Sequence, residues 1–122
     1  MKQPGRIHHI AVIVPSIEDS LGLYRDRLGM PLETIMDIPT DRVRIAFLGV
    51  GESKVELVEP TDDSTGVARF LASKGPGFHH VCYEVADLTE ELTRLAIDGI
   101  ELIEAPGGPA WTSLGMTAPK AR

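Results

Sequence analysis

Two pairs of adjacent histidines stand at matching places in a sequence that partly repeats itself. His8 and His9 open one short apolar run, and His79 and His80 open a similar run 71 positions later. Neighbouring side chains of a β-strand point to opposite faces, so the two histidines of each pair should point opposite ways. The more apolar face of each run should pack under helices. That leaves His9 and His80 on the open face of a sheet.

A third candidate ligand comes from the run Lys54–Glu59. Val55 and Leu57 share its apolar face, so Glu56 should point to the same side as His9 and His80. Two imidazoles and a carboxylate bind a divalent ion such as Zn²⁺, Co²⁺, Mn²⁺ or Fe²⁺ and leave positions open for a substrate. A single strand histidine is more often a core or surface residue, and the equivalent placement in a repeat is what favours a metal here.

The segments around the histidines predict two similar modules. The first begins with a strand over 7–14, and Ser16 is a good N-cap for the helix that follows. Apolar residues then recur at helical spacing until Gly29, a natural C-terminal stop. Three more β-rich runs follow, so the first module, about 7–60, should have the order β-α-β-β-β with its last three strands over 32–38, 43–50 and 54–59.

The second module is expected to be incomplete. A linking helix over about 64–74 leads to the second histidine strand, 78–85, and then to a helix capped by Asp87 and stopped by Gly99. A strand over 100–103 should close this module, which covers about 77–104. The tail, 105–122, shows no strand alternation, so two strands of the first copy appear without a counterpart.

Bulk composition predicts one soluble domain over residues 1–122. The chain has a net charge of −6 and no cluster of basic residues, which argues against nucleic-acid binding. A single cysteine, Cys82, excludes an internal disulfide and a multi-cysteine zinc site. The chain has no apolar run long enough to cross a membrane, and residues 1–6 do not resemble a signal peptide. These features predict a cytoplasmic protein without a membrane partner.

The sequence resembles the vicinal oxygen chelate superfamily, which includes glyoxalases, extradiol dioxygenases and methylmalonyl-CoA epimerases. It is most similar to the epimerase branch, over roughly residues 7 to 104. The resemblance implies an α+β fold in which paired βαβββ modules form a cup around a metal. The segments that carry it are His8–Val12, Val43–Leu48 running into Gly51–Pro60, Ser64–Leu71 and Gly75–Val81.

For the site, the resemblance implies that His9, Glu56 and His80 are the metal ligands. The metal would be a divalent ion, with Co²⁺ or Mn²⁺ favoured over Zn²⁺, Ni²⁺ or Fe²⁺. The implied substrate is an acyl-CoA, and the implied reaction inverts C2 of methylmalonyl-CoA through a metal-stabilised enolate. Two acid/base groups on opposite faces of that carbon would exchange the proton.

The chain departs from the family's pattern in two places. No residue corresponds to the glutamate of the last strand, which is the fourth ligand and one acid/base of the family. The turn that carries the other acid/base is Pro39-Thr40-Asp41-Arg42 here, where the family tends to have a glutamate. Asp41 is the candidate for that catalytic role, with Asp37 as the alternative.

These departures keep two other functions open. One is a glyoxalase-like lyase or isomerase that acts on another vicinal-oxygen substrate. The other is a metal- or ligand-binding protein without catalysis. A cup that lacks two strands would also expose a sheet edge, which invites pairing with a second chain. We therefore expect a homodimer, in agreement with the common dimerisation of the superfamily.

Overall fold

The computed structural model describes residues 3–101 and 113–117, with side chains described for residues 3–101. The first module has the predicted order, with one strand, a helical segment and three further strands. Its elements are β1 (Arg6–Ile13), α1 (Ile17–Leu21), the π-helix η1 (Gly22–Arg27), β2 (Leu32–Ile38), β3 (Val43–Val50) and β4 (Ser53–Pro60). The remaining elements are α2 (Gly66–Lys74), β5 (Gly77–Glu84), α3 (Leu88–Ile97) and β6 (Ser113–Thr117).

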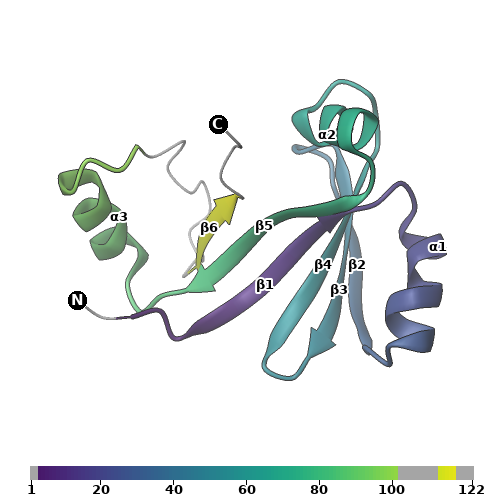
Figure 1. The fold of residues 1–122 in the computed structure, drawn as a ribbon, viewed down its shortest axis with the longest axis horizontal. Coiled ribbons are helices and arrows are strands. Elements are labelled where there is room, and N and C mark those ends of the chain that lie inside the picture. The colour runs from purple at the N-terminus through teal and green to yellow at the C-terminus, as the bar shows by residue number, and fades with distance from the viewer. Residues whose placement is uncertain (1–2, 102–112, 118–122) are drawn as a thin grey trace.

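All described strands belong to one sheet with the order β2-β3-β4-β1-β5-β6. The two histidine strands, β1 and β5, are neighbours and run antiparallel, whereas β1 and β4 run parallel. In Figure 1, β1 and β5 form a long diagonal that joins the first module to α3 and β6. The predicted α+β fold of the superfamily is confirmed.

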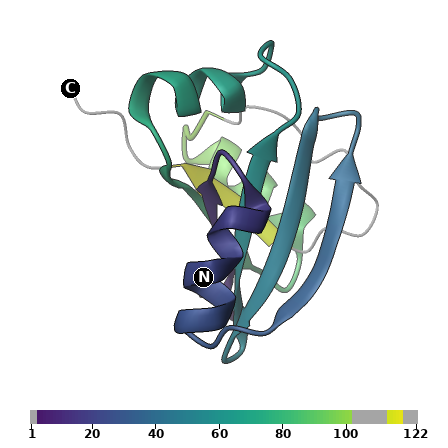
Figure 2. The same cartoon turned by 90° about the vertical axis from the view of Figure 1, so that its right-hand side faces the viewer.

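The first module has a hydrophobic cluster on each face of its sheet. On one face, Val14, Leu48 and Leu57 pack with Ile17 and Leu21 of α1. Figure 2 shows α1 lying across this face, with α2 at one end of the sheet. On the other face, Ala11 and Ile13 pack with residues of β3 and β4 and with the apolar side of α2. His9 follows the alternation of Ala11 and Ile13, so it lies on the side of the sheet that α2 partly covers.

The helix predicted after Ser16 changes its hydrogen-bond pattern part of the way along. Ser16 caps it as expected, since its hydroxyl accepts a hydrogen bond from the Asp19 amide at 3.2 Å. From Gly22 the helix is a π-helix, and the Leu28 amide donates to the Leu23 carbonyl. Gly29 then ends the segment with a φ of 76°, a conformation that glycine adopts without strain.

The second module differs from the prediction after α3. Asp87 caps α3 as predicted, with its carboxylate accepting from the Glu90 amide. Ile100 and Glu101 are not in a strand, so that part of the predicted strand is wrong, and residues 102 and 103 lie outside the described residues. The tail, predicted to lack a strand, contributes β6, which pairs antiparallel with β5. Backbone pairing along β5 stabilises this strand without requiring the alternation that was sought in the sequence.

Candidate metal centre

Strand register brings the three predicted ligands together around Ala11. Ala11 lies opposite Glu56 on β4 and opposite His80 on β5. Residues paired across a sheet point to the same face, so Glu56 and His80 flank the small Ala11 side chain on one side of the sheet. His9 lies two residues earlier on β1 and shares that face. Three neighbouring strands thus supply one ligand candidate each.

The three side chains form a compact group. One donor atom from each of His9, Glu56 and His80 lies within 4.8 Å of the others. The Nε2 atom of His9 is 3.6 Å from the Oε1 atom of Glu56. The His9 and His80 rings meet edge to face with centroids 5.6 Å apart, and Phe47 packs against His9 at 5.5 Å. Two nitrogens and an oxygen at this spacing match the donor set that divalent transition metals prefer.

Burial controls the protonation of this group. His9 is 5 % exposed, and desolvation, followed by the nearby His80 and His8, lowers its pKa to about 4. Desolvation by burial also lowers the pKa of His80, with His79 adding to the effect. Burial raises the pKa of Glu56 to about 7, because the charged carboxylate loses its hydration. Near neutral pH, the imidazoles of His9 and His80 are therefore uncharged, and each can offer a lone pair.

The first histidine of each pair does not lie where strand alternation predicts. His8 and His79 were expected on the opposite face from their neighbours, and this expectation is wrong. The Nδ1 atoms of His8 and His9 are 2.8 Å apart, and those of His79 and His80 are also 2.8 Å apart. Alternation describes only regular strands, and both pairs lie at irregular points of the β1–β5 ladder. The recurrence of the His-His pair was the only sequence signal for this contact.

Asp41 does not join the group of candidate metal ligands. It lies exposed in the turn between β2 and β3, where its amide donates to the Ile38 carbonyl. Phe47 is the β3 residue that pairs with Glu56, whereas Val43, at the start of β3, pairs with Pro60. The four steps from Val43 to Phe47 span roughly 13 Å at 3.3 Å per residue, so the turn that holds Asp41 lies at the far end of β3 from Glu56. The catalytic role of Asp41 stays a prediction, as does that of Asp37, which is also exposed.

The chain belongs to the Glyoxalase/Bleomycin resistance protein/Dioxygenase superfamily, whose sequence profile matches residues 8–115. Within it, the chain is 36% identical to the mitochondrial methylmalonyl-CoA epimerase of Mus musculus over 86 residues, which cover 70% of this chain and 48% of the relative. The match therefore spans about half the length of that protein. This chain is also 35% identical to an ethylmalonyl-CoA/methylmalonyl-CoA epimerase of Cereibacter sphaeroides, in a match that covers 81% of this chain and 75% of the relative.

A solved structure of an epimerase has the same fold. The structure of a methylmalonyl-CoA epimerase in complex with methylmalonyl-CoA and NH4+ has a TM-score of 0.78 and 25% identity, covering 84% of this chain and 75% of the other. In the described part of this chain, no helix is both long and apolar enough to cross a membrane.

Proposed function

We propose that the chain is a metal-dependent epimerase that inverts C2 of methylmalonyl-CoA, with His9, Glu56 and His80 as the ligands of a divalent ion. The observation that carries the proposal is the convergence of two imidazoles and one carboxylate within 4.8 Å, on three adjacent strands. The names of the relatives support the substrate class, an acyl-CoA. Co²⁺ and Mn²⁺ remain the favoured ions, with Zn²⁺, Ni²⁺ and Fe²⁺ as alternatives.

The residues of the cluster fit a cation. The side chain of Glu56 is only 13 % exposed, and in the described part of the chain no hydrogen bond reaches its carboxylate. A buried carboxylate without such a partner is unstable when charged. A positive ion at the centre of the cluster would remove this cost, and the uncharged rings of His9 and His80 would add neutral nitrogen donors.

When bound, a divalent ion supplies positive charge that stabilises an enolate and lowers the barrier to removal of the C2 proton. The protein's part is to hold the donors and exclude water. Ala11, fully buried, lies between Glu56 and His80, and its small side chain separates the two. Phe47 covers one side of His9. Asp41 remains the predicted group that takes up or returns the C2 proton.

Isotope exchange tests the proposal directly. The protein, loaded with Co²⁺ or Mn²⁺, is incubated with methylmalonyl-CoA in D₂O, and deuterium at C2 is followed by mass spectrometry. We expect exchange above the protein-free rate, and a loss of at least tenfold in Glu56→Gln, which removes the anionic ligand. Exchange no faster than in the protein-free sample would contradict the proposal.

Glu59→Gln is the matched control for Glu56→Gln. Glu59 lies on the same strand but on the opposite face, which α1 covers. There its Oε1 accepts a hydrogen bond from the Ile17 amide at 2.7 Å. A glutamine there retains an acceptor, so exchange should stay near the wild-type rate.

Two other outcomes would reassign the function. Turnover of a glutathione hemithioacetal without C2 exchange would indicate a glyoxalase-like enzyme. Tight metal binding without turnover of either substrate would indicate a binding protein. A cytoplasmic location and a homodimeric state remain predictions.

A further inference from the structure

The pairing of β1 with β5 has an internal twofold symmetry. Shifting each residue by the 71-position repeat converts the pair His9–Cys82 into Ala11–His80, and converts Ile10–Val81 into itself. The pseudo-twofold axis therefore passes through the Ile10–Val81 pair. The strand pairing around one histidine pair is therefore repeated around the other.

Each strand of this ladder contains one extra residue, and in both cases it is the first histidine of the pair. Ile7 and His9 lie opposite the consecutive residues Tyr83 and Cys82, so His8 is left out of the pairing. In the same way, Ala11 and Val12 lie opposite His80 and Phe78, so His79 is left out. Such β-bulges turn the side chain of the extra residue away from the direction it would have in a regular strand.

The bulges bring each extra histidine against a ligand candidate. The Nδ1–Nδ1 distance is 2.8 Å in both pairs, which is hydrogen-bonding distance. A hydrogen bond between two imidazole Nδ1 atoms needs one proton, donated by one Nδ1 and accepted by the other. If His9 donates, its Nε2 is bare, and Nε2 is the atom that lies 3.6 Å from the Glu56 carboxylate.

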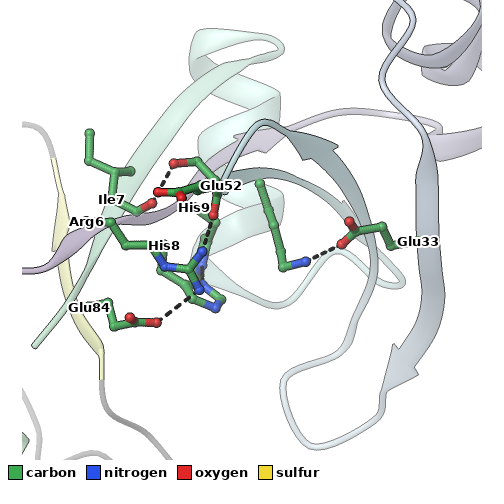
Figure 3. Close-up of polar contacts among 9 residues, drawn as sticks. Arg6, Ile7, His8, His9, Glu33, Glu52 and Glu84 are labelled. Carbon is green, nitrogen blue, oxygen red and sulfur yellow. Dashed lines mark hydrogen bonds and ion pairs between the residues drawn. The ribbon is translucent and has the colours of Figure 1, made fainter. Parts of the chain in front are cut away.

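Further contacts hold both bulges in place. Just before His8, the Arg6 guanidinium bridges the Glu84 carboxylate of β5 at 3.1 Å and the Glu52 carbonyl (Figure 3). The Ile7 carbonyl accepts a hydrogen bond from the Ser53 hydroxyl at 2.7 Å. On the other strand, the His79 ring packs edge to face on Phe70 of α2, with centroids 5.3 Å apart. The backbone just before His8 is thus tied to both neighbouring strands, and the His79 side chain is packed against α2.

We propose that His8 and His79 are positioning residues, each of which accepts the Nδ1 proton of the next histidine and so fixes the tautomer that turns a bare Nε2 toward the metal. The inference rests on the proposed metal site and extends it to two residues outside the ligand set. Metal-binding histidines are commonly held in this way by an acceptor on the second ring nitrogen. Here the acceptor is another histidine, supplied by a bulge, at both symmetry-related positions.

Nitrogen NMR of the metal-free protein tests the inference without any need for activity. With ¹⁵N-labelled histidine at pH 7.5, long-range ¹H–¹⁵N spectra identify which nitrogen of each ring carries the proton. We expect His9 and His80 of the wild type to carry it on Nδ1. Wild-type spectra with the proton on Nε2 of both rings would overturn the inference before any variant is made.

The two bulges act as controls for each other. His8→Leu removes the acceptor at one ring, so His9 should shift toward the Nε2–H form while His80 stays unchanged. His79→Leu should do the reverse. His8→Asn and His79→Asn place an amide oxygen close to where Nδ1 was and should restore the wild-type tautomer. A His9 tautomer that is the same in wild type and in folded His8→Leu would contradict the proposal.

Calorimetry with Zn²⁺ separates this inference from the proposed function. Loss of the acceptor should weaken Zn²⁺ binding about 10- to 100-fold in each leucine variant, with most of it regained in the asparagine variants. If the wild type binds Zn²⁺ tightly and the leucine variants bind equally well, the inference fails and the metal site stands. If the wild type binds none of Zn²⁺, Co²⁺ and Mn²⁺, the proposed function fails, and the NMR spectra still decide whether His8 and His79 fix the tautomers.

Discussion

The Nε2 atom of His9 lies 3.6 Å from the Oε1 atom of Glu56, yet in the metal-free protein the two groups do not form an ion pair near neutral pH. Burial shifts both toward their uncharged forms, with a pKa of about 4 for His9 and about 7 for Glu56. The contact therefore joins a neutral imidazole to a carboxyl group that ionises close to physiological pH. Several consequences can be measured.

The stability of the metal-free protein should depend on pH through Glu56. Its pKa rises from 4.5 in the unfolded chain to about 7 in the fold, so the folded state retains a proton that the unfolded state loses. Stability is therefore lost as pH rises from 4.5 to 7, by about 3 kcal/mol in total. Glu56→Gln does not titrate, so its stability relative to wild type should rise by about 2 kcal/mol between pH 5 and pH 8.

Urea unfolding of both proteins at the two pH values measures this difference. Because His9 is present in both, its own contribution, which lowers stability as pH falls from 6.5 toward 4, largely cancels. A difference between the two proteins that does not change with pH would show that Glu56 ionises as it does in water.

Metal binding should release a proton in a pH-dependent way. With a pKa of about 7, Glu56 must lose about 0.9 proton at pH 6 but only about 0.1 at pH 8 to become an anionic ligand. Zn²⁺ titrations in two buffers with different ionisation enthalpies measure this number. Proton release that is equal at both pH values would argue against Glu56 as a ligand.

A larger side chain at Ala11 should remove metal binding. Ala11 is fully buried between Glu56 and His80, so the larger side chain of Ala11→Leu has to displace at least one of them. Ala46→Leu is the matched control, because Ala46 is also fully buried but packs in the cluster under α1. Both variants should lose about 1–3 kcal/mol of stability from overpacking. Only Ala11→Leu should lose Zn²⁺ affinity, and equal affinity in the two variants would place the ion elsewhere.

The predicted homodimer can be tested by mass. The described sheet ends at β2 and β6, and the exposed edge of a strand is a surface on which a second chain can pair. Size-exclusion chromatography with light scattering should give about 26 kDa, twice the chain mass of 13.2 kDa. A mass near 13 kDa that is independent of concentration would show that the chain is a monomer.

The sequence was a good guide wherever strand pairing is regular. Alternation along β4 placed Glu56 on the face opposite Leu57, and the repeat put His9 and His80 at equivalent positions of the two histidine strands. Ser16 and Asp87 marked the starts of the helices, because a side-chain oxygen at an N-cap satisfies an otherwise free amide. These features depend on local chemistry or on a period of two residues, so they can be read without knowledge of the partner strands.

The bulges and β6 could not be predicted from local sequence patterns. A bulge is defined by how many residues face each other across two strands, and nothing within His8–Val12 alone reveals that number. β6 is stabilised by backbone hydrogen bonds to β5, which the side-chain pattern of the tail does not encode. The π-helix after Leu21 likewise results from hydrogen bonds that skip one residue more than the spacing of apolar side chains suggested.

The matching bulges also bear on the history of the chain. Pairing between β1 and β5 continues on both sides of His8 and of His79, so each histidine behaves as a single inserted residue. The insertions stand at the same point of the 71-position repeat. One insertion in an ancestral half-length module, copied when that module was duplicated, accounts for both. Two separate later events would have to coincide in position, in residue type and in the contact they form.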